Sequence, residues 1–581
     1  MGLKKRKDCT QNNNIEKDFC ISGALTSKKL LEYIPVMILT NISVLLLVSV
    51  DGLVVGNLVG EQALSSVSIF YPAIALIGVI SAWVACGSAT SLSAAMSKNE
   101  NSKILHLKHT INFLTIASAV FIGIAQIPAV HLIINSYKLS PELHDLTWQY
   151  AIGVMCSMPF GLISNVGVYQ LQIIGKMKML GVLALIEGCT NLIFDLMFVK
   201  FFRMGVAGAG YGTLCANLVR SFLTVAYLAK KTGLYKCHGA KINIHDIKEI
   251  LINGLPEASN SIMLAIQSYF MLSIIIKSFG EFGGAIKSCC DFSTNVALIF
   301  INSIQSSARP LISIMNGSED YKGLRILIRQ CVLLITGFIG IFTAMIWFFP
   351  RIVYRIHGIN NVPNGAILSL RIYSVCFLLL GFNTLFRAYF SNCGQAKYSS
   401  ILTIIGNSTL AFFALILSKS FLGSDVWLAY SCKELLMLSV NLCFYWNKLK
   451  LKANQVERNS TVLYMTVKPE DAIAASRQIR HYADDNSYPP KISNRISLAM
   501  EEMVAYAAKS QNNQNIQIQI VIRFFKDRAI FVMLDDGKCI ALDSNNKIQE
   551  LITDNYGLLK KVAKSVKYQY ILNMNYTIFE F

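Results

Sequence analysis

Residues 44–51 read VLLLVSVD, an apolar run that ends on an aspartate. A carboxylate within hydrocarbon costs about 2.5–3.5 kcal/mol on insertion scales, so it usually has a partner or a task. Residues 191–195, NLIFD, repeat this pattern and place Asn191 four residues before Asp195, on the same helix face. Two acids and an amide at membrane depth predict a cation site. The sequence therefore indicates an ion-coupled transporter.

The composition is that of a polytopic membrane protein. The chain has 581 residues, of which 54% are hydrophobic and only 15% charged, whereas soluble domains carry about 25% charged residues. We assign the net charge of +19 to Lys and Arg in short cytoplasmic loops, and we expect no nucleic-acid partner. The fifteen cysteines include no CxxC pair, so no structural metal or disulfide framework is predicted.

Twelve apolar segments of about 20 residues or more predict an all-α polytopic bundle of twelve transmembrane helices. They centre near Leu46, Ile77, Ile116, Val154, Leu185, Leu214, Leu264, Ile299, Ile335, Phe377, Ile405 and Leu435. The even-to-odd connections carry most of the Lys and Arg, so both termini are expected in the cytoplasm and the protein in the plasma or inner membrane. The polar, basic N-terminus predicts no cleaved signal.

A faint internal repeat divides the bundle into two six-helix lobes. Residues 175–186 resemble residues 394–405, about 220 positions later, and repeated halves are typical of transporters with a central cavity. At that offset Asn191 and Asp195 correspond to Leu410 and Ala414. We therefore expect the cation chemistry in the first half alone.

These patterns give five predicted regions along the chain. They are an N-terminal cytoplasmic segment (1–27), an N-lobe (28–235), a C-lobe (236–446), a linker (447–459) and a cytoplasmic α/β domain built as an α+β sandwich (460–581).

Several motifs resemble those of the MATE (multidrug and toxic compound extrusion) family, over about residues 28–446. They are VDGLVVGNLVGEQAL (50–64), LQIIGKMK (171–178), NLIFD (191–195), GVAGAGYGT (205–213), GLP (254–256), ARP with NG (308–317) and DVWLA (425–429). The resemblance implies a twelve-helix antiporter, not an enzyme. It would export organic, cationic compounds by alternating access, driven by Na+ or H+.

The resemblance also implies the residues of the ion site. The liganding set would be Asp51, Asn191, Asp195 and Thr213, with Asp51, Asn191 and Asp195 as Na+ ligands if the driving ion is Na+. Pro35 would be the residue at which the first helix bends. Hard oxygen ligands suit either ion, so the sequence leaves Na+ and H+ open.

Three polar or aromatic residues of the fourth predicted helix are candidate lining residues of the same cavity: Asn165, Tyr169 and Gln170. The amides could instead join helices, and the tyrosine could anchor the helix at the membrane interface. Both interpretations stay open.

The C-terminal domain is predicted as strand, helix (469–483), helix (493–509), two strands, helix (557–566) and strand. It resembles the ATP-binding domains of anti-sigma factors and histidine kinases in SLAMEEMVAYA (497–507), VMLDDG (532–537), NYGL (555–558) and YQYILNMN (568–575). The resemblance implies a vestigial nucleotide site of Glu502, Asp535, Gly537 and Gly557.

Departures from that family argue against phosphoryl transfer. Its Mg2+-binding Asn is replaced by Tyr506, and two of its glycines by Cys539 and Asn555. Without the metal ligand and the close backbone approach to phosphates, we expect a regulatory domain with a cytoplasmic protein partner and no cofactor. Two alternatives remain: a flippase for lipid precursors, or a membrane-anchored sensor that acts through this domain.

Overall fold

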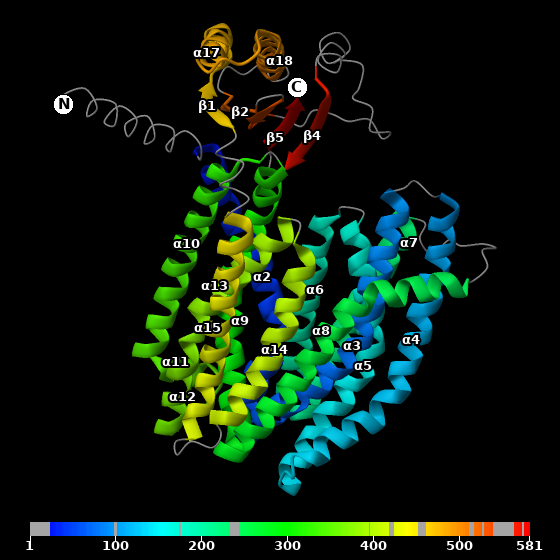
Figure 1. Cartoon of the computed structure of the whole chain (residues 1–581). Helices are drawn as coiled ribbons and strands as arrows, with labels where there is room; N and C mark the ends of the chain where they lie inside the picture. The colour runs from blue at the N-terminus through cyan, green and yellow to red at the C-terminus, as the bar shows by residue number, and fades with distance from the viewer. Residues whose placement is uncertain are drawn as a thin grey trace, which may run out of the picture.

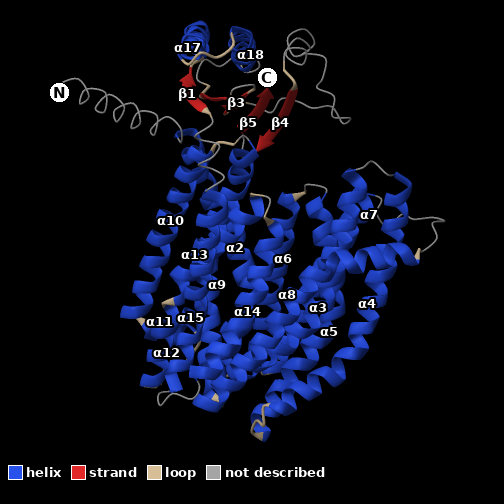
Figure 2. Cartoon of the chain, viewed as in Figure 1, coloured by secondary structure: helices blue, strands red, loops and turns tan. Residues whose placement is uncertain are grey.

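The computed structural model describes residues 24–97, 101–173, 176–232, 243–317, 319–393, 395–417, 423–450, 460–509, 516–525, 528–537, 563–571 and 574–581. They form a bundle of long helices that carries a small sheet and two further helices at one end (Figure 1). Strands occur only in this C-terminal part of the described chain (Figure 2). We call the end that bears the sheet the tail end and the opposite one the far end.

The first half of the bundle consists of six long helices. They are α2 (Ala24–Leu58), α3 (Glu61–Ser97), α4 (Asn101–Ser136), α5 (Pro141–Ile173), α6 (Met177–Leu196) with the π-turn η1 (Met197–Phe201), and α7 (Val206–Thr232).

The second half is more interrupted. It consists of α8 (Ile244–Phe279), α9 (Phe282–Gly317), α10 (Tyr321–Phe348), α11 (Pro350–Ile356), α12 (Asn364–Ser374), α13 (Cys376–Asn392), α14 (Ala396–Leu417), the 3-10 turn η2 (Gly423–Trp427), α15 (Leu428–Phe444) and the π-turn η3 (Tyr445–Lys450).

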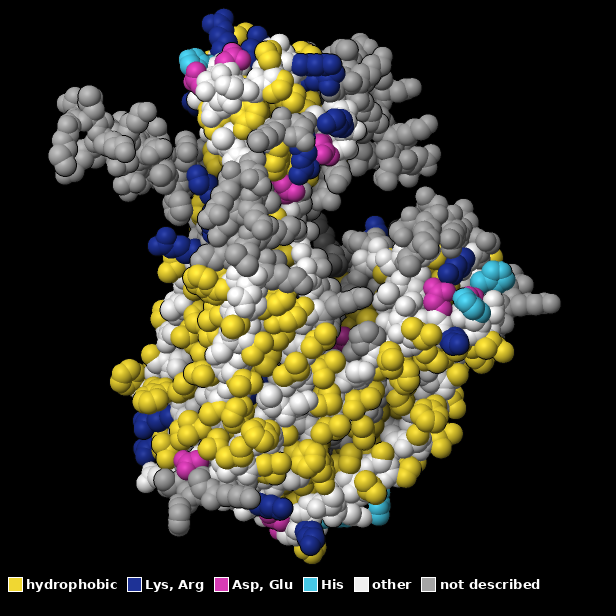
Figure 3. All heavy atoms as spheres, viewed as in Figure 1, with side chains coloured by type: hydrophobic (Ala, Val, Ile, Leu, Met, Phe, Trp, Pro, Cys, Tyr) yellow, Lys and Arg dark blue, Asp and Glu magenta, His cyan; other side chains and the backbone are white. Residues whose placement is uncertain are grey.

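The surface of the bundle is suited to lipid. Within the described ranges, nine helical stretches are long and apolar enough to cross a membrane. Large apolar side chains such as Ile124, Leu132 and Phe222 point outward, and yellow apolar side chains cover the middle of the bundle in Figure 3. Since a soluble protein rarely exposes so large an apolar surface, the chain is a multi-pass membrane protein, as predicted.

Two helices, α2 and α8, cross between the halves. Leu30 and Ile34 of α2 belong to the apolar core of the second half, whereas Val50 and Val54, further along the same helix, belong to the core of the first half. In α8 the tail-end residue Ile250 belongs to the first-half core. Each crossing helix therefore connects the two halves mechanically.

Glycines allow α8 to approach α3 closely. A Cβ on Gly87 would overlap the backbone of Ile250, and one on Gly254 would overlap the backbone of Trp83. The Trp83 indole donates a hydrogen bond to the Leu251 carbonyl at 2.7 Å. The glycine of the predicted GLP motif thus serves helix packing.

At the far end, hydrogen bonds join the two halves directly. The Asn57 amide donates to the Ile356 carbonyl at 2.6 Å. The Ser140 backbone N–H and hydroxyl donate to the Glu281 carboxylate at 2.6 and 3.0 Å. A Cβ on Gly56 would overlap the His357 carbonyl, so the first and second halves are in close contact at this end.

The C-terminal sheet is antiparallel throughout, with strand order β1-β2-β3-β5-β4. Its strands are β1 (Thr461–Val467), β2 (Ile518–Phe524), β3 (Ala529–Asp535), β4 (Ser565–Ile571) and β5 (Met574–Glu580). Helices α17 (Ala472–Asp485) and α18 (Pro490–Lys509) pack on one face, against Ile520 and Ile522. Val521, Val532 and Leu534 point the other way, into the core of the second half of the bundle.

One predicted element of this domain is wrong at its end. The helix expected over 557–566 cannot extend through Ser565 and Val566, because both residues pair with β5 as the start of β4. Residues 557–562 lie outside the described part. The single final strand that we expected is instead a hairpin of β4 and β5.

Candidate functional site

Asp51 lies on α2 and is nearly inaccessible to solvent. One oxygen of its carboxylate, Oδ2, accepts hydrogen bonds from the Tyr150 hydroxyl at 2.6 Å and from the Thr213 hydroxyl at 2.9 Å. These donors come from α5 and α7. Asp51 therefore joins three helices of the first half at one point.

Asp195 and Asn191 lie one turn apart on α6 and face the same cluster. Asp195 is 0% exposed. No described amide, hydroxyl or backbone N–H donates to its carboxylate oxygens, and its hydrogen-bonding contact is with the Asp51 carboxyl. The Asn191 amide donates to the Thr213 hydroxyl at 3.4 Å, while its own carbonyl oxygen is buried and without a partner in the described structure. The cluster thus has more acceptor oxygens than donors.

The glycines of the GVAGAGYGT segment bring α7 against its neighbours. A Cβ on Gly210 would overlap the Tyr150 carbonyl, and one on Gly212 would overlap the Asp195 carboxylate. The same glycines let Thr213 of α7 reach Asp51 of α2. The local sequence therefore builds the cluster that the motif predicted.

This arrangement can hold a cation. Two carboxylates in a low-dielectric site cannot both be charged at little cost, so a proton or a Na+ between them is favoured. The oxygens of Asp195 and Asn191, with the Asp51 carboxylate, are the hard ligands that such an ion takes. The four predicted ion-site residues are thus brought together, and their role stays a prediction.

Tyr150 is a part of this cluster that the sequence analysis missed. Its ring packs edge-to-face on Phe70 with centroids 5.8 Å apart, and its hydroxyl makes the shortest of the bonds to Asp51. A tyrosine near a helix start in an apolar segment usually serves as an interface anchor. Tyr150 lies 99 residues from Asp51 in the sequence, and only the folded structure shows that the two side chains are in contact.

The other predicted first-half residues lie away from the cluster. Asn165 follows Tyr150 by 15 residues on α5, about 22 Å along the helix axis, and donates to Ser81 of α3 at 3.1 Å. Gln170 is buried, and its amide has no partner among described residues; Tyr169 is half-buried. Pro35 lies on the exposed side of α2, which is a single helix through this position.

In the predicted nucleotide site of the tail, the carboxylate of Asp535 is already hydrogen-bonded to groups of the domain itself. This buried carboxylate accepts hydrogen bonds from the Asn575 amide at 2.7 Å and from the Gly537 N–H at 3.0 Å, and burial raises its pKa above the ordinary value. Glu502 lies half-buried on α18, and Gly557 is outside the described residues. Asp535 is thus used for strand pairing and turn formation.

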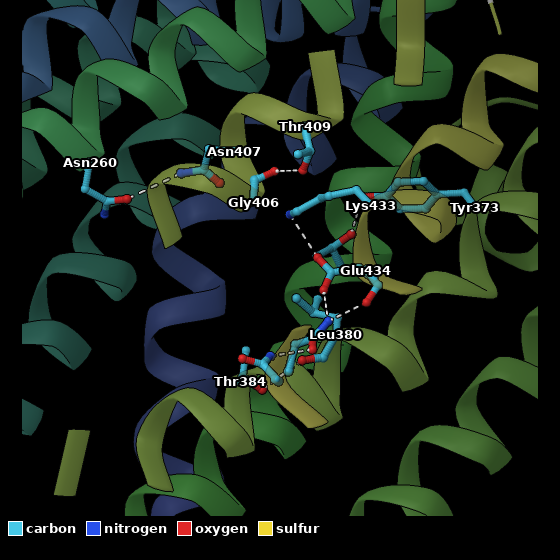
Figure 4. A network of polar contacts seen from close by, with 12 residues as sticks. Asn260, Tyr373, Leu380, Thr384, Gly406, Asn407, Thr409, Lys433 and Glu434 are labelled. Atoms are coloured by element: carbon cyan, nitrogen blue, oxygen red, sulfur yellow. Dashed lines mark hydrogen bonds and ion pairs between the residues drawn. The ribbon is translucent and has the colours of Figure 1, made fainter. Parts of the chain in front are cut away.

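The second half contains a charged network that sequence reasoning did not identify (Figure 4). On α15, Lys433 and Glu434 form an ion pair of 2.9 Å. The Asn383 amide of α13 donates to the Glu434 carboxylate at 2.7 Å, and the Asn441 amide donates to the Asn383 carbonyl oxygen at 2.8 Å. The available signal was a Lys-Glu pair inside the twelfth apolar segment.

Comparison with known proteins supports the transporter fold. The MatE family model matches residues 37–197 and 260–416, together more than half of the chain. The multidrug export protein MepA of Staphylococcus aureus (strain MSSA476) is 22% identical over 409 residues, which are 69% of this chain and 90% of that protein. MepA of Staphylococcus saprophyticus is 20% identical over 411 residues, with the same coverage.

Solved structures show the same bundle. An inward-facing multidrug resistance MATE family transporter of the MOP superfamily aligns with a TM-score of 0.63 and 21% identity, over 71% of this chain and 95% of that one. An outward-facing counterpart aligns with a TM-score of 0.58 and 21% identity, over 74% and 97%. With the family model matched over both halves of the bundle, this chain belongs to the MatE family of membrane transporters.

Proposed function

We propose that the protein is a cation-coupled antiporter that exports organic compounds by alternating access, with twelve transmembrane helices in two lobes. The observation that carries this proposal is the group of buried acceptor oxygens on Asn191 and Asp195 to which no described N–H or hydroxyl donates, next to the Asp51 carboxylate. Such a group within a membrane is costly unless a cation is bound. The names of the MepA relatives, multidrug export proteins, support an organic substrate.

Twelve helices follow if three more helices span the membrane besides the nine that are long and apolar enough. These are α2, α14 and α15. They carry Asp51, Asn407 and Glu434, respectively. The described apolar stretch of α14, Ile404–Leu417, is shorter than a single span, and α15 has 17 residues, so length sets these two helices apart.

The crossing helix α2 would couple the ion to the conformational change. Beyond the Asp51 cluster, its tail-end half is tied to the second lobe: the Asn41 amide donates to Ser303 at 2.9 Å and the Gln330 amide to Ser27 at 2.6 Å. Pro35 lies between these ties and removes one backbone hydrogen bond of the helix. Loading the cluster would change the position of α2, and therefore the packing of the two lobes.

The arrangement supports an inward-facing state. We propose that the tail end is cytoplasmic, in keeping with the positive-inside rule. The hydrogen bonds from Asn57 and Ser140 to the second lobe then lie at the extracellular end.

The C-terminal domain would act as a regulator through the α9–α10 connection. The Tyr464 hydroxyl of β1 donates to Asp320 at 2.8 Å, and the Lys322 ammonium lies 5.5 Å from the centre of the Tyr464 ring. Arg528 and Glu319 form an ion pair of 3.5 Å. A cytoplasmic protein that binds this domain could therefore alter the second lobe.

Efflux of a cationic dye from proteoliposomes tests the function. We expect the native protein to move the dye under a Na+ or an H+ gradient, applied separately to identify the ion. Asp51→Asn and Asp195→Asn should each lose this transport, whereas Asp145→Asn, which alters an exposed carboxylate on α5, should keep it.

The opposite result would discard the proposal. Variants that transport as well as the native protein would exclude the cluster as the coupling site. A native protein that moves neither the cationic dye nor a carboxylate-bearing dye under either gradient would instead favour lipid transport or signalling through the tail.

A further inference from the structure

The strongest unassigned polar cluster lies on one stripe of α15 and its preceding turn. Trp427, Ser431, Glu434 and Asn441 follow one another at intervals of three, four or seven residues and therefore share a helix face. Glu434 and Asn441 are buried. The neighbouring Lys433 reaches the stripe through its long side chain and pairs with Glu434.

The Glu434 carboxylate is supported independently of Lys433. Asn383 donates to it at 2.7 Å and is itself held by Asn441 at 2.8 Å. The half-buried Arg387, one turn after Asn383 on α13, also interacts electrostatically with Glu434. Glu434 would therefore keep partners if the Lys433 ammonium turned away.

The Lys433 ammonium, in contrast, has fewer partners than N–H donors. Its one partner among the described residues is Glu434, although an ammonium has three N–H donors. Its side chain keeps 16% exposure, twice that of Glu434. With Arg387 and Glu434 counted, the cluster carries one positive charge in excess at membrane depth.

Other donors on the stripe are also unpartnered. The Trp427 indole N–H, which can only donate, and the Ser431 hydroxyl are buried without a hydrogen-bond partner in the described structure. The unpartnered acceptor of the stripe, the Asn441 carbonyl oxygen, lies two turns beyond Glu434. Trp427 lies as far from Glu434 on the other side, so the spare donors next to Lys433 are those of the ammonium itself and the Ser431 hydroxyl, which an anionic group would satisfy.

The cluster faces the connection between the halves. Figure 4 shows the Lys433 side chain extending toward α14, which carries Asn407 and Thr409. The Asn407 amide donates to Asn260 of α8 at 3.3 Å, and α8 is one of the two crossing helices. Aromatic rings border the other side, where Tyr373 packs edge-to-face on Tyr430 with centroids 4.8 Å apart.

We propose that Lys433 binds the carboxylate of the exported compound and that the substrates are carboxylate-bearing aromatic amphiphiles. The substrate carboxylate takes the place of Glu434 at the ammonium, while Asn383 and Arg387 retain Glu434. This inference rests on the proposed export function and adds its substrate class.

Equilibrium binding of two xanthene dyes to the purified full chain tests the proposal. Carboxyfluorescein carries free carboxylates, and a rhodamine ethyl ester has the same ring system with a positive charge. Lys433→Gln should weaken carboxyfluorescein binding about tenfold or more and leave the rhodamine unchanged. Lys433→Arg should preserve carboxyfluorescein binding, and Glu434→Gln should strengthen it, because the competing carboxylate is gone.

The control is Lys277→Gln, which removes an exposed lysine near the far end of α8 and should change neither dye. Equal binding by Lys433→Gln and this control would overturn the proposal. Equal weakening of the binding of both dyes, or weaker carboxyfluorescein binding in Glu434→Gln, would overturn it in favour of a purely structural ion pair.

If Lys433→Gln does not fold, the double variant Lys433→Met with Glu434→Met removes the pair without changing the net charge. A preference for carboxyfluorescein that survives in this double variant would also overturn the proposal.

Asp51→Asn separates this proposal from the proposed function. It should abolish gradient-driven transport of either dye and leave the equilibrium preference for carboxyfluorescein intact. Loss of that preference in Asp51→Asn, in a variant that still folds, would contradict an independent second-half site. Absence of transport in the native protein, with the Lys433 binding pattern present, would contradict the export function alone.

Discussion

The two halves of the bundle share an architecture and carry polar clusters of opposite character. In the first half, Asp195 and Asn191 offer buried acceptor oxygens to which no described N–H or hydroxyl donates. In the second half, the buried donors around Lys433 are in surplus, and the one carboxylate there, Glu434, is already held by an amide. The two halves therefore have similar helices but different polar side chains. The acceptor oxygens of the first half suit a cation, and the donors of the second half suit an anion.

The largest expected effect is a difference in dye efflux between variants of Asp195 in the first half and Glu434 in the second half. Asp195→Asn should lower gradient-driven efflux of a cationic dye at least tenfold, because it removes a carboxylate of the proposed ion site. Glu434→Gln should leave that efflux within about twofold, since the proposal places coupling in the first half and Gln can still accept the hydrogen bond from Asn383. Both rates are measured in proteoliposomes at equal protein density. An equal loss in Glu434→Gln would place coupling in both halves.

The next effect concerns the glycine beneath Asp195. In Gly212→Ala the new methyl group would overlap the Asp195 carboxylate, and overpacking of this kind costs about 1–3 kcal/mol. We expect a lower melting temperature and a loss of the stabilisation that the driving ion gives to the native protein. Gly340→Ala, where a Cβ meets no atom within 4 Å, is the control and should not destabilise. A Gly212→Ala protein that still responds to the ion would separate Asp195 from ion binding.

A smaller effect is expected from Tyr150→Phe. It deletes one of the two donors to Asp51, and a single hydrogen bond contributes about 0.5–1.5 kcal/mol. The ion concentration for half-maximal efflux should therefore shift by about two- to tenfold while the maximal rate survives. Tyr71→Phe, at an exposed position, provides the matched comparison. An unchanged ion dependence would remove Tyr150 from the site.

The smallest effect lies at the joint between bundle and tail. Burial raises the pKa of Asp320 above its ordinary value of 3.8, although the Gly323 N–H and the Tyr464 hydroxyl act to lower it. The docked form thus binds a proton more readily than an undocked one, so docking should weaken as pH rises from about 3.8 through the raised pKa. Asp320→Asn keeps an acceptor oxygen and should flatten this dependence.

Hydrogen exchange of β1 as a function of pH measures the docking. Asp485→Asn, which changes an exposed carboxylate of the tail, is the control and should follow the native profile. A native profile in Asp320→Asn as well would assign the pH dependence to another group.

A helical membrane bundle and the aspartates of the first cluster could be predicted from the sequence. An aspartate stands out within an otherwise apolar segment. Tyr150 and Gly212 could not be assigned this way, since a tyrosine and a glycine are ordinary in membrane helices. Lys433 and Glu434 stand next to each other in the twelfth segment, and adjacent opposite charges in a sequence do not show which partners each side chain has in space. Only their unequal partners in space distinguish them. The boundary of β4 was missed because apolar residues near it also suit a helix.

The sheet of the tail is buried on both faces, with every residue of β2 and β3 inaccessible. One of those faces is covered by the membrane bundle itself, through residues such as Val521 and Val532. During synthesis the helices enter the membrane before the last strands leave the ribosome, so the bundle supplies the surface on which the sheet is completed. Cut off from it, the tail would present a bare apolar sheet and aggregate. The membrane bundle would then act as the folding template of its own C-terminal domain.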